Sequence, residues 1–479
     1  MLFNSLEFAI FFPIVAAMYF MLPQRFRTLH LLVSSCIFYM AFIPAYILIL
    51  ALTIAIDYTA GIYLEKVDGR ARLWLLVASV IATCLVLFVF KYFYFFTNNV
   101  VGLVGLFGWQ LSGPSVKILL PIGLSFHTFQ SLSYVIEVYR GRQKAESNFV
   151  TYATYVMFFP QLVAGPIERP QNLLHQFCER HDFDYARVTS GLKRMAWGFF
   201  KKLVIADRLA LYVNDVYAKP QDFNGLQLTI ATIFFAYQIY CDFSGYSDIA
   251  IGSARVLGFR LMENFNKPYH ALTISEFWRR WHISLSTWFR DYVYILMGGS
   301  RFGERRHFAS QLVTFVVSGL WHGANWTYVF WGLLNAIYLI VGSLGKDVRN
   351  RTFGLIGMNE GTWPRRSIMW ASTFLLTSVG WILFRANTMA DAWYILTHFA
   401  IGWDFGRIST EQFLMRQMPV AVAGIALLEA IQLLQNRVSL SAFVAKLPLI
   451  PRWALYASAV IATIMFGIFR QTQFIYFQF

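Results

Sequence analysis

Two histidines, His282 and His322, are the residues of this chain whose type and surroundings best suit chemistry. They stand in the stretches Trp278-Arg-Arg-Trp281-His282 and Trp321-His322-Gly, within strongly apolar sequence. An ionisable side chain at membrane depth is costly and by default marks a functional site. A neutral imidazole accepts a proton near pH 7, so both side chains are candidates for catalysis as a general base.

His322 is the better candidate for the base. It lies within residues 309–342, an apolar run that is too long for one membrane-spanning helix. Gly319, Gly323 and Asn325 predict a break near the middle of this run, so we expect His322 at a helix break. Burial there would disfavour the charged imidazolium and favour the neutral base. The alternative is a structural histidine that donates a hydrogen bond to a carbonyl group in a kinked helix.

His282 is expected on one helix over about 275–296, with Thr273 or Ser275 as its cap. Helical spacing predicts an apolar face of Trp278, Trp281, Leu285, Trp288 and Tyr292. An adjacent polar face would hold Arg279, His282, Ser286 and Arg290. This mixture is typical of an interfacial helix or of one that lines a polar cavity. In a plain membrane-surface anchor, the alternative, His282 would have no chemical role.

Other side chains near the histidines are candidates for binding a substrate or an acyl donor. They are Trp278, Arg279, Arg280, Trp281, Ser286, Arg290, Trp321, Asn325 and Asp242. Arginines between 279 and 306 suit the phosphates of a donor, although Arg305 and Arg306 are equally typical of a cytoplasmic loop. Asp242 and Asp248 can orient a histidine or bind a cation, but such residues more often cap a helix or pair with arginine. The four dispersed cysteines predict neither a disulfide framework nor a metal site.

The composition predicts an all-α, polytopic membrane protein. Of the 479 residues, 57% are hydrophobic and only 14% are charged, whereas about 25% are charged in a typical soluble domain. Apolar runs of about 20 residues recur along the chain, as spanning helices require. The net charge of +15 agrees with basic cytoplasmic loops and not with nucleic-acid binding, for which no basic polar domain is present. P-loop, HExxH and GxSxG motifs are absent.

We expect about eleven spans with additional re-entrant and interfacial helices, in one domain (1–479) whose catalytic core covers about 119–345. Ile43-Pro44 predicts a break within residues 29–64. The prolines of 158–170 predict irregular backbone that is sheltered by protein or by a water-filled cavity. Basic loops such as 65–72 predict a cytoplasmic side, which places the N-terminus in the periplasm.

The longest motifs resemble those of the membrane-bound O-acyltransferase family, and its bacterial branch that acetylates extracellular polysaccharides in particular. The resemblance covers nearly the whole chain and is carried by residues 278–294, 321–326, 240–246 and 474–479. It implies a ring of tilted helices around a central tunnel, with His322 as the catalytic residue and His282 as a second functional histidine. It also implies acetyl transfer from a cytoplasmic donor, acetyl-CoA, to periplasmic or membrane-anchored partner proteins that acetylate a polymer such as alginate in the periplasm.

In this scheme His322 deprotonates an acceptor hydroxyl, and Asn325 or His282 stabilises the oxyanion. A covalent acetyl-histidine route is equally open. Within the same family, transfer of D-alanine to teichoic acid, or of acetyl groups to peptidoglycan or cellulose, remains an alternative. A proton-coupled secondary transporter is the alternative from another class, although we find none of the internal repeats that such transporters usually show.

Overall fold

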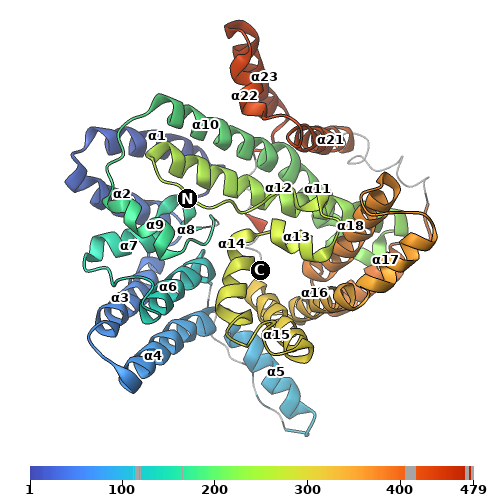
Figure 1. Ribbon diagram of the computed structural model, residues 1–479, viewed down its shortest axis with the longest axis horizontal. Helices are drawn as coiled ribbons and strands as arrows, with labels where there is room; N and C mark the ends of the chain where they lie inside the picture. The colour runs from blue at the N-terminus through green and yellow to red at the C-terminus, as the bar shows by residue number, and fades with distance from the viewer. Residues whose placement is uncertain are drawn as a thin grey trace.

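The computed structural model describes residues 1–109, 111, 113, 118, 120–163, 165–404, 417–469 and 474–475. Every regular element in these ranges is a helix, which confirms the expected all-α fold. The longer helices surround two short ones, α13 (Ile274–Arg280) and α14 (Ile283–Phe289), near the centre of the view in Figure 1.

The bounds of the elements follow in chain order. The N-terminal part consists of α1 (Leu6–Met21), α2 (Gln24–Met40), α3 (Tyr46–Leu64), α4 (Gly69–Leu87), the π-helical turn η1 (Phe88–Tyr92), α5 (Phe93–Gly105), α6 (Leu124–Tyr139), α7 (Phe149–Met157), α8 (Phe159–Leu162), α9 (Pro170–Leu173) and the 3₁₀ turn η2 (Leu174–Cys178). The middle of the chain adds α10 (Tyr185–Phe199), the π-helical η3 (Phe200–Ala206), α11 (Asp207–Ala218), η4 (Pro220–Asp222), α12 (Gly225–Leu257) and η5 (Pro268–His270). After α13 and α14 follow the π-helical η6 (Arg290–Tyr294), α15 (Glu304–His322), α16 (Trp326–Leu344), α17 (Lys346–Leu355), α18 (Trp363–Arg385), α19 (Met389–His398), α21 (Met418–Leu434), α22 (Leu440–Lys446) and α23 (Leu449–Phe466).

Five helical segments of the described chain are long and apolar enough to cross a membrane. They are Tyr46–Leu64, Gly69–Gly105, Trp326–Leu344, Trp363–Arg385 and Leu449–Phe466, and two shorter apolar helices cover Leu6–Met21 and Met418–Leu434. The expected count of about eleven spans is therefore not reproduced, because several inner helices are too short or too polar. The break predicted at Ile43-Pro44 is confirmed, since α2 ends at Met40 and α3 begins at Tyr46.

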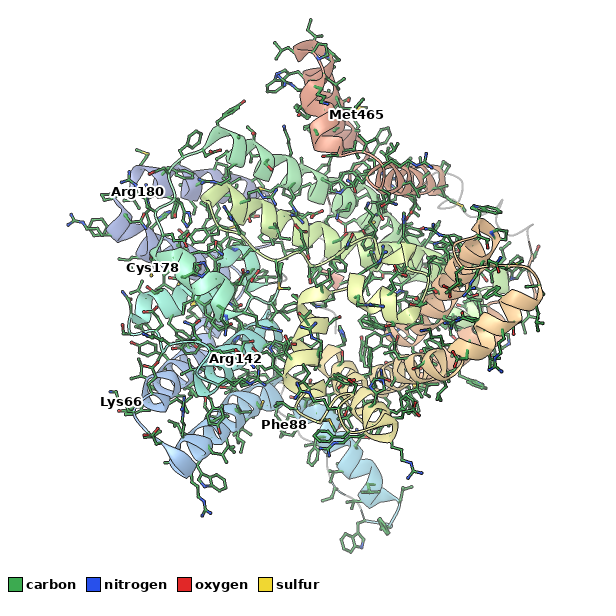
Figure 2. The ribbon with its side chains drawn as sticks, viewed as in Figure 1. Lys66, Phe88, Arg142, Cys178, Arg180 and Met465 are labelled. Atoms are coloured by element: carbon green, nitrogen blue, oxygen red, sulfur yellow. The ribbon has the colours of Figure 1, made fainter. Side chains whose placement is uncertain are left out.

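The apolar segment from Gly69 to Gly105 contains a change of helix type. It is one helical segment of 37 residues, and η1 is inserted as a π-helical turn within it. Figure 2 labels Phe88, the first residue of this turn. Single π-helical turns inside α-helices are frequent at functional sites, and η1 proves to face the end of α15 (see below).

The centre of the fold is α12, a 33-residue helix, with α10 packed along it. Glycines allow the close approach of the two backbones: a Cβ atom at Gly198 would lie 2.6 Å from the carbonyl oxygen of Gly245. The helices α21 to α23 project from this body at the top of Figure 1. Met465, labelled in Figure 2, lies on α23 and is 73% exposed, as expected for a helix that faces lipid.

The hairpin of α15 and α16 positions His322. Its two helices pack so closely that a Cβ atom at Gly332 would overlap the carbonyl oxygen of Phe315, and one at Gly319 would overlap that of Tyr328. The predicted helix break is confirmed, because α15 ends at His322 and α16 begins at Trp326.

Replacement of Gly332 with alanine is expected to separate the two helices and to destabilise the protein by about 1–3 kcal/mol, the usual cost of overpacking. Thermal unfolding of the purified protein in detergent measures this loss. Gly342→Ala is the matched control on α16, because no atom lies within 4 Å of the added Cβ there. Equal melting temperatures of the two variants would contradict the close packing of the hairpin.

Candidate functional site

His282 lies at a break between two short helices, and the expected continuous helix over 275–296 is wrong. The residue stands between α13 and α14 with φ 43° and ψ 54°, in the left-handed region that non-glycine residues rarely adopt. Among the described residues only Lys267 shares a positive φ without being glycine. Such strain persists only where the surroundings enforce it, and it clusters at functional sites.

The break also moves His282 away from the predicted polar face. Its side chain is 1% exposed, whereas Arg279 and Arg290 are exposed. Of the predicted apolar face, Trp281, Leu285, Trp288 and Tyr292 are buried, whereas Trp278 is half-buried. His282 therefore belongs to the protein interior and does not snorkel to a membrane surface.

Asn264 orients the ring of His282. The Oδ1 atom of Asn264 lies 3.1 Å from Nδ1 of His282, and it also accepts hydrogen bonds from the backbone N–H of Ser284 at 3.3 Å and from its hydroxyl at 2.9 Å. Because the backbone N–H can only donate, Oδ1 is the acceptor, and Nδ1 of His282 carries the hydrogen. In the neutral ring, Nε2 is then the unprotonated nitrogen that can accept a proton.

His322 is the last residue of α15 and is 5% exposed. Aromatic rings enclose its imidazole: the ring centroids of Trp321, Trp331 and Phe384 lie 4.8, 5.1 and 5.1 Å away. The rings cover most of the imidazole, and electrostatic interactions are stronger in such surroundings than in bulk solvent.

Trp321 connects the two histidines. Its ring centroid is 6.3 Å from that of His282 and 4.8 Å from that of His322. Phe126 of α6 stacks near His282 at 6.3 Å and contacts Trp321 at 5.5 Å. His282 and His322, which are 40 positions apart in the sequence, therefore lie in one aromatic cluster. Both also have tryptophans as neighbours in the sequence.

Two cavities adjoin this cluster. The larger has a volume of about 320 Å³ and is lined by Asn264 and Phe265, which contact His282, and by polar and charged side chains of α10, η3, α12 and the loop before η5. The smaller has a volume of about 60 Å³ and is lined by His322, Trp321, Phe126 and Lys91. Each histidine therefore has a cavity next to it, and Phe126 and Trp321 of the smaller cavity also contact His282.

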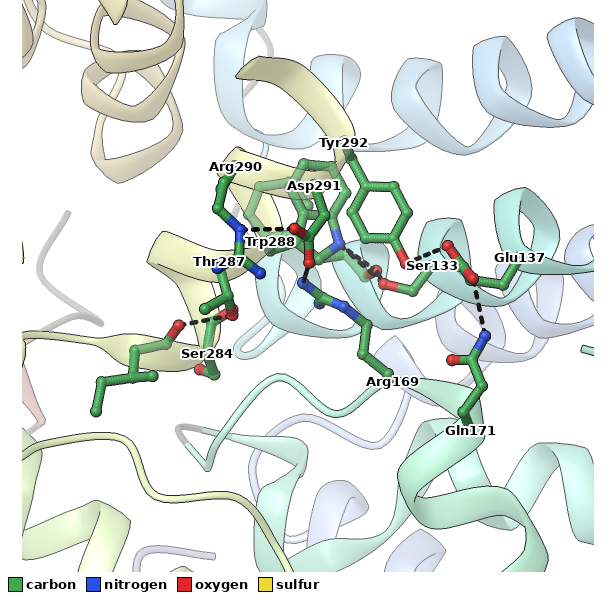
Figure 3. A network of polar contacts seen from close by, with 12 residues as sticks. Ser133, Glu137, Arg169, Gln171, Ser284, Thr287, Trp288, Arg290, Asp291 and Tyr292 are labelled. Carbon is green, nitrogen blue, oxygen red and sulfur yellow. Dashed lines mark hydrogen bonds and ion pairs between the residues drawn. The ribbon is translucent and has the colours of Figure 1, made fainter. Parts of the chain in front are cut away.

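A polar network anchors the segment that follows His282 to its neighbours (Figure 3). Trp288 donates to the hydroxyl of Ser133 at 2.9 Å, and Tyr292 donates to Glu137 at 3.0 Å, so α14 and η6 are tied to α6. Asp291 pairs with Arg290 at 2.8 Å and with Arg169 at 3.4 Å. Arg290, expected to bind the donor, is thus in a structural ion pair.

The other arginines expected at the donor site do not line either cavity. Arg280 pairs with Glu276 at 2.5 Å, and Arg279 donates to the carbonyl of Ser275 in its own helix. Ser286 donates to the carbonyl of Trp281, and Trp278 donates to the Oδ1 atom of Asn335. Instead, the basic side chains of the larger cavity are Arg194, Lys201 and Lys267.

Asn325 and Asp242 have structural partners. Asn325 caps α16 by accepting from Thr327 N–H at 3.1 Å, and its amide donates to the carbonyl of Asn387 at 3.2 Å. The oxygen of this amide and one of its N–H groups therefore hold the start of α16. Asp242 forms an ion pair of 2.6 Å with Lys202 and accepts from the backbone N–H of Ile475 at 2.8 Å.

Asp248 is also paired, with Arg194 at 2.9 Å and with Lys201 at 2.7 Å. Pairing with basic residues, the alternative considered from the sequence, is therefore what the structure shows for both aspartates. In the described part of the chain, no three His, Cys, Asp or Glu side chains form a group that suits a metal ion.

Two functional candidates, Asn264 and Lys91, are not evident from the motifs alone. A signal for Lys91 was present, because it is a lone lysine within the apolar segment Gly69–Gly105, and an intramembrane charge is a functional hypothesis by default. Asn264 had no such signal, since its role depends on a contact with His282, 18 residues away.

The chain is similar to several known acyltransferases. The model of the membrane-bound O-acyltransferase family matches residues 140–384, which include both histidines. The probable alginate O-acetylase AlgI of Pseudomonas aeruginosa is 39% identical over 400 residues, which cover 82% of this chain and 74% of that protein. The peptidoglycan O-acetyltransferase of Helicobacter pylori is 32% identical over 430 residues (83% and 79%). The teichoic acid D-alanyltransferase of Bacillus subtilis is 28% identical over 274 residues (54% and 66%).

Proposed function

Because the chain belongs to the membrane-bound O-acyltransferase family, we propose that it passes acetyl groups from a cytoplasmic thioester donor, acetyl-CoA, across the inner membrane for the O-acetylation of an exported polysaccharide. One observation carries the proposal: the buried His282 and His322 share an aromatic cluster that adjoins two separate cavities. Family membership favours this acyl transfer over the proton-coupled transport considered from the sequence.

The larger cavity is the proposed donor site. Its volume of about 320 Å³ lies at the lower end of the usual range for small-molecule sites. Lys267 supplies positive charge beside Arg194 and Lys201, whose carboxylate partners Asp248 and Glu263 also line the cavity. The lining amides of Asn266, Gln432 and Gln435 suit the amide groups of a pantetheine arm. Lys267 donates to the Oδ1 atom of Asn436 at 2.6 Å; burial lowers its pKa, and the nearby Arg280 lowers it further.

In the proposed reaction, His322 acts as general base. Its imidazole takes the proton of an acceptor hydroxyl, the acceptor oxygen attacks the thioester carbonyl carbon, and the thiolate leaves with the proton returned from His322. His282, whose neutral ring presents Nε2 as a proton acceptor, guides the donor or the acceptor into place. In the acetyl-histidine route, His322 itself accepts the acetyl group first, and both routes need the same residue.

We further propose a catalytic core of about residues 119–345, an N-terminus in the periplasm, and periplasmic or membrane-anchored acetyltransferases as partners. Alginate is the proposed polymer class, supported by the name of the relative from Pseudomonas aeruginosa. Peptidoglycan is the alternative acceptor that the relative from Helicobacter pylori suggests.

The proposal is tested with the purified protein in proteoliposomes that are supplied with ¹⁴C-acetyl-CoA and a soluble oligosaccharide of uronic acids. We expect release of free CoA and labelled, base-labile acetyl ester on the acceptor or on the protein. Vesicles with a D-alanyl-charged carrier protein are run in parallel. If only the D-alanyl thioester is turned over, the donor is a D-alanyl carrier protein and the proposed acetyl donor is wrong. Hydrolysis of the thioester without formation of an ester would contradict acyl transfer to a hydroxyl.

A further inference from the structure

Lys91 reaches from η1 to the end of the helix that carries His322. Its Nζ atom donates to the carbonyl oxygen of Trp321 at 2.5 Å and to that of His322 at 3.2 Å. The next residue, Tyr92, donates from its hydroxyl to the carbonyl of Leu320 at 2.9 Å. Two consecutive side chains of the π-helical turn thus bind the last three carbonyls of α15, which have no partner within the helix itself.

The charge of Lys91 is not neutralised by a carboxylate. Among the described residues it forms no ion pair, whereas the buried Lys201 and Lys202 each pair with aspartate. Its partners are the hydroxyl of Ser125 at 3.5 Å, the carbonyl dipoles at the C-terminal end of α15, where a cation is favourable, and the ring of Trp321, whose centroid lies 5.7 Å from Nζ. An uncompensated cation in an apolar segment is costly, and such residues are rare outside functional sites.

Lys91 is also the charged side chain of the smaller cavity. The lining of this cavity is otherwise apolar apart from Ser125 and His322. Its volume of about 60 Å³ exceeds several-fold the space that one water molecule needs, and it suits a small acyl group. A negative charge that forms there would meet one cation, Lys91, next to the proposed base.

We propose that Lys91 is a catalytic residue that stabilises the oxyanion formed during acyl transfer, an inference that rests on the proposed function. When the acceptor oxygen bonds to the thioester carbon, the electron pair of the C=O double bond moves to the carbonyl oxygen, which becomes negative. The ammonium group of Lys91 stabilises this oxygen. The pair then returns to re-form C=O as the C–S bond breaks, and the thiolate leaves and takes the proton from His322.

The proposal assigns to Lys91 the role that the sequence suggested for Asn325 or His282. Asn325 caps α16 and does not line the smaller cavity, and Nδ1 of His282 is bound to Asn264. Preorganised donors at a developing oxyanion, in a site that excludes water, typically contribute a factor of about 10²–10³ to kcat. The carbonyl groups of α15 hold the ammonium in place before the reaction, as this mechanism requires.

The test compares Lys91→Met, Lys91→Arg and Tyr92→Phe in the proteoliposome assay. We expect Lys91→Met to lower kcat by about 10²–10³-fold with the KM for the thioester unchanged, because the charge acts on the reacting group and not on donor binding. Lys91→Arg retains the cation and should recover part of kcat. Tyr92→Phe is the matched control, since it removes the neighbouring hydrogen bond to α15 without removing charge, and its kcat should stay within a few fold of wild type.

Equal losses of kcat in Lys91→Met and Tyr92→Phe would overturn the proposed role of Lys91, and so would a Lys91→Met variant with wild-type kcat. Neither result would affect the proposed function of the protein. A rise in KM at unchanged kcat would also overturn the role of Lys91, because it would indicate donor binding. Failure of the wild-type protein to transfer an acyl group from any thioester would overturn the proposed function and this inference with it. Melting temperatures of all variants separate a catalytic loss from unfolding.

Discussion

His322→Ala is expected to lower acetyl transfer from the thioester donor by about 10²–10⁴-fold, the usual contribution of a positioned general acid–base. The loss should appear in kcat, because His322 lies at the smaller cavity and not at the larger, proposed donor cavity. Steady-state rates of CoA release and of ester formation measure it. His322→Gln tests whether a polar side chain of similar size is sufficient, and we expect that it is not, since an amide cannot act as a base.

His307→Ala is the matched control for this experiment. His307 lies on the same helix, α15, at its other end, where it contacts the hydroxyl of Tyr294 at 2.6 Å. Because His307 lines neither cavity, we expect transfer close to the wild-type rate. Undiminished turnover in His322→Ala, with a normal melting temperature, would refute the assignment of the base. A loss of the same size in His307→Ala would indicate that damage to α15 is responsible.

Lys202→Met is expected to have the largest effect on stability. Lys202 is 1% exposed and forms ion pairs of 2.8 Å with Asp207 and 2.6 Å with Asp242. Removal of the lysine takes its positive charge away from two buried carboxylates, and breaking a buried ion pair from one side typically costs about 3–5 kcal/mol. Thermal unfolding in detergent, followed by tryptophan fluorescence, should show a strongly lowered melting temperature and a reduced yield of folded protein.

Two further variants make this result interpretable. Lys193→Met removes an exposed lysine that contacts only the ring of Tyr456 among the interactions described, and its melting temperature should remain near that of the wild type. Lys202→Met combined with Asp242→Asn should recover part of the lost stability, because one uncompensated charge is removed. If Lys202→Met melts like the wild type, the ion pairs do not hold η3 to α12, and Asp242 returns as a candidate for the site.

The sequence by itself determined the features that depend on local pattern. Hydropathy and breaker residues located the break between α2 and α3. They also located the helix end at His322, because Gly319, Gly323 and Asn325 lie in one apolar run. The tryptophan motifs indicated the family, which the comparisons confirm. These signals are sufficient because helix formation in an apolar environment is governed by neighbours in the sequence.

The tertiary structure decided which side chains meet. The left-handed conformation of His282 breaks a helix that the spacing of its tryptophans favours, and it is enforced by contacts with Asn264 and the surrounding rings. Lys91 contacts Trp321, which lies 230 residues further along the chain, and Asp242 is held by Lys202 rather than by a substrate. No local pattern encodes such contacts, because they depend on how distant helices pack around α12. The partner of each buried charge, and therefore its role, follows only from that packing.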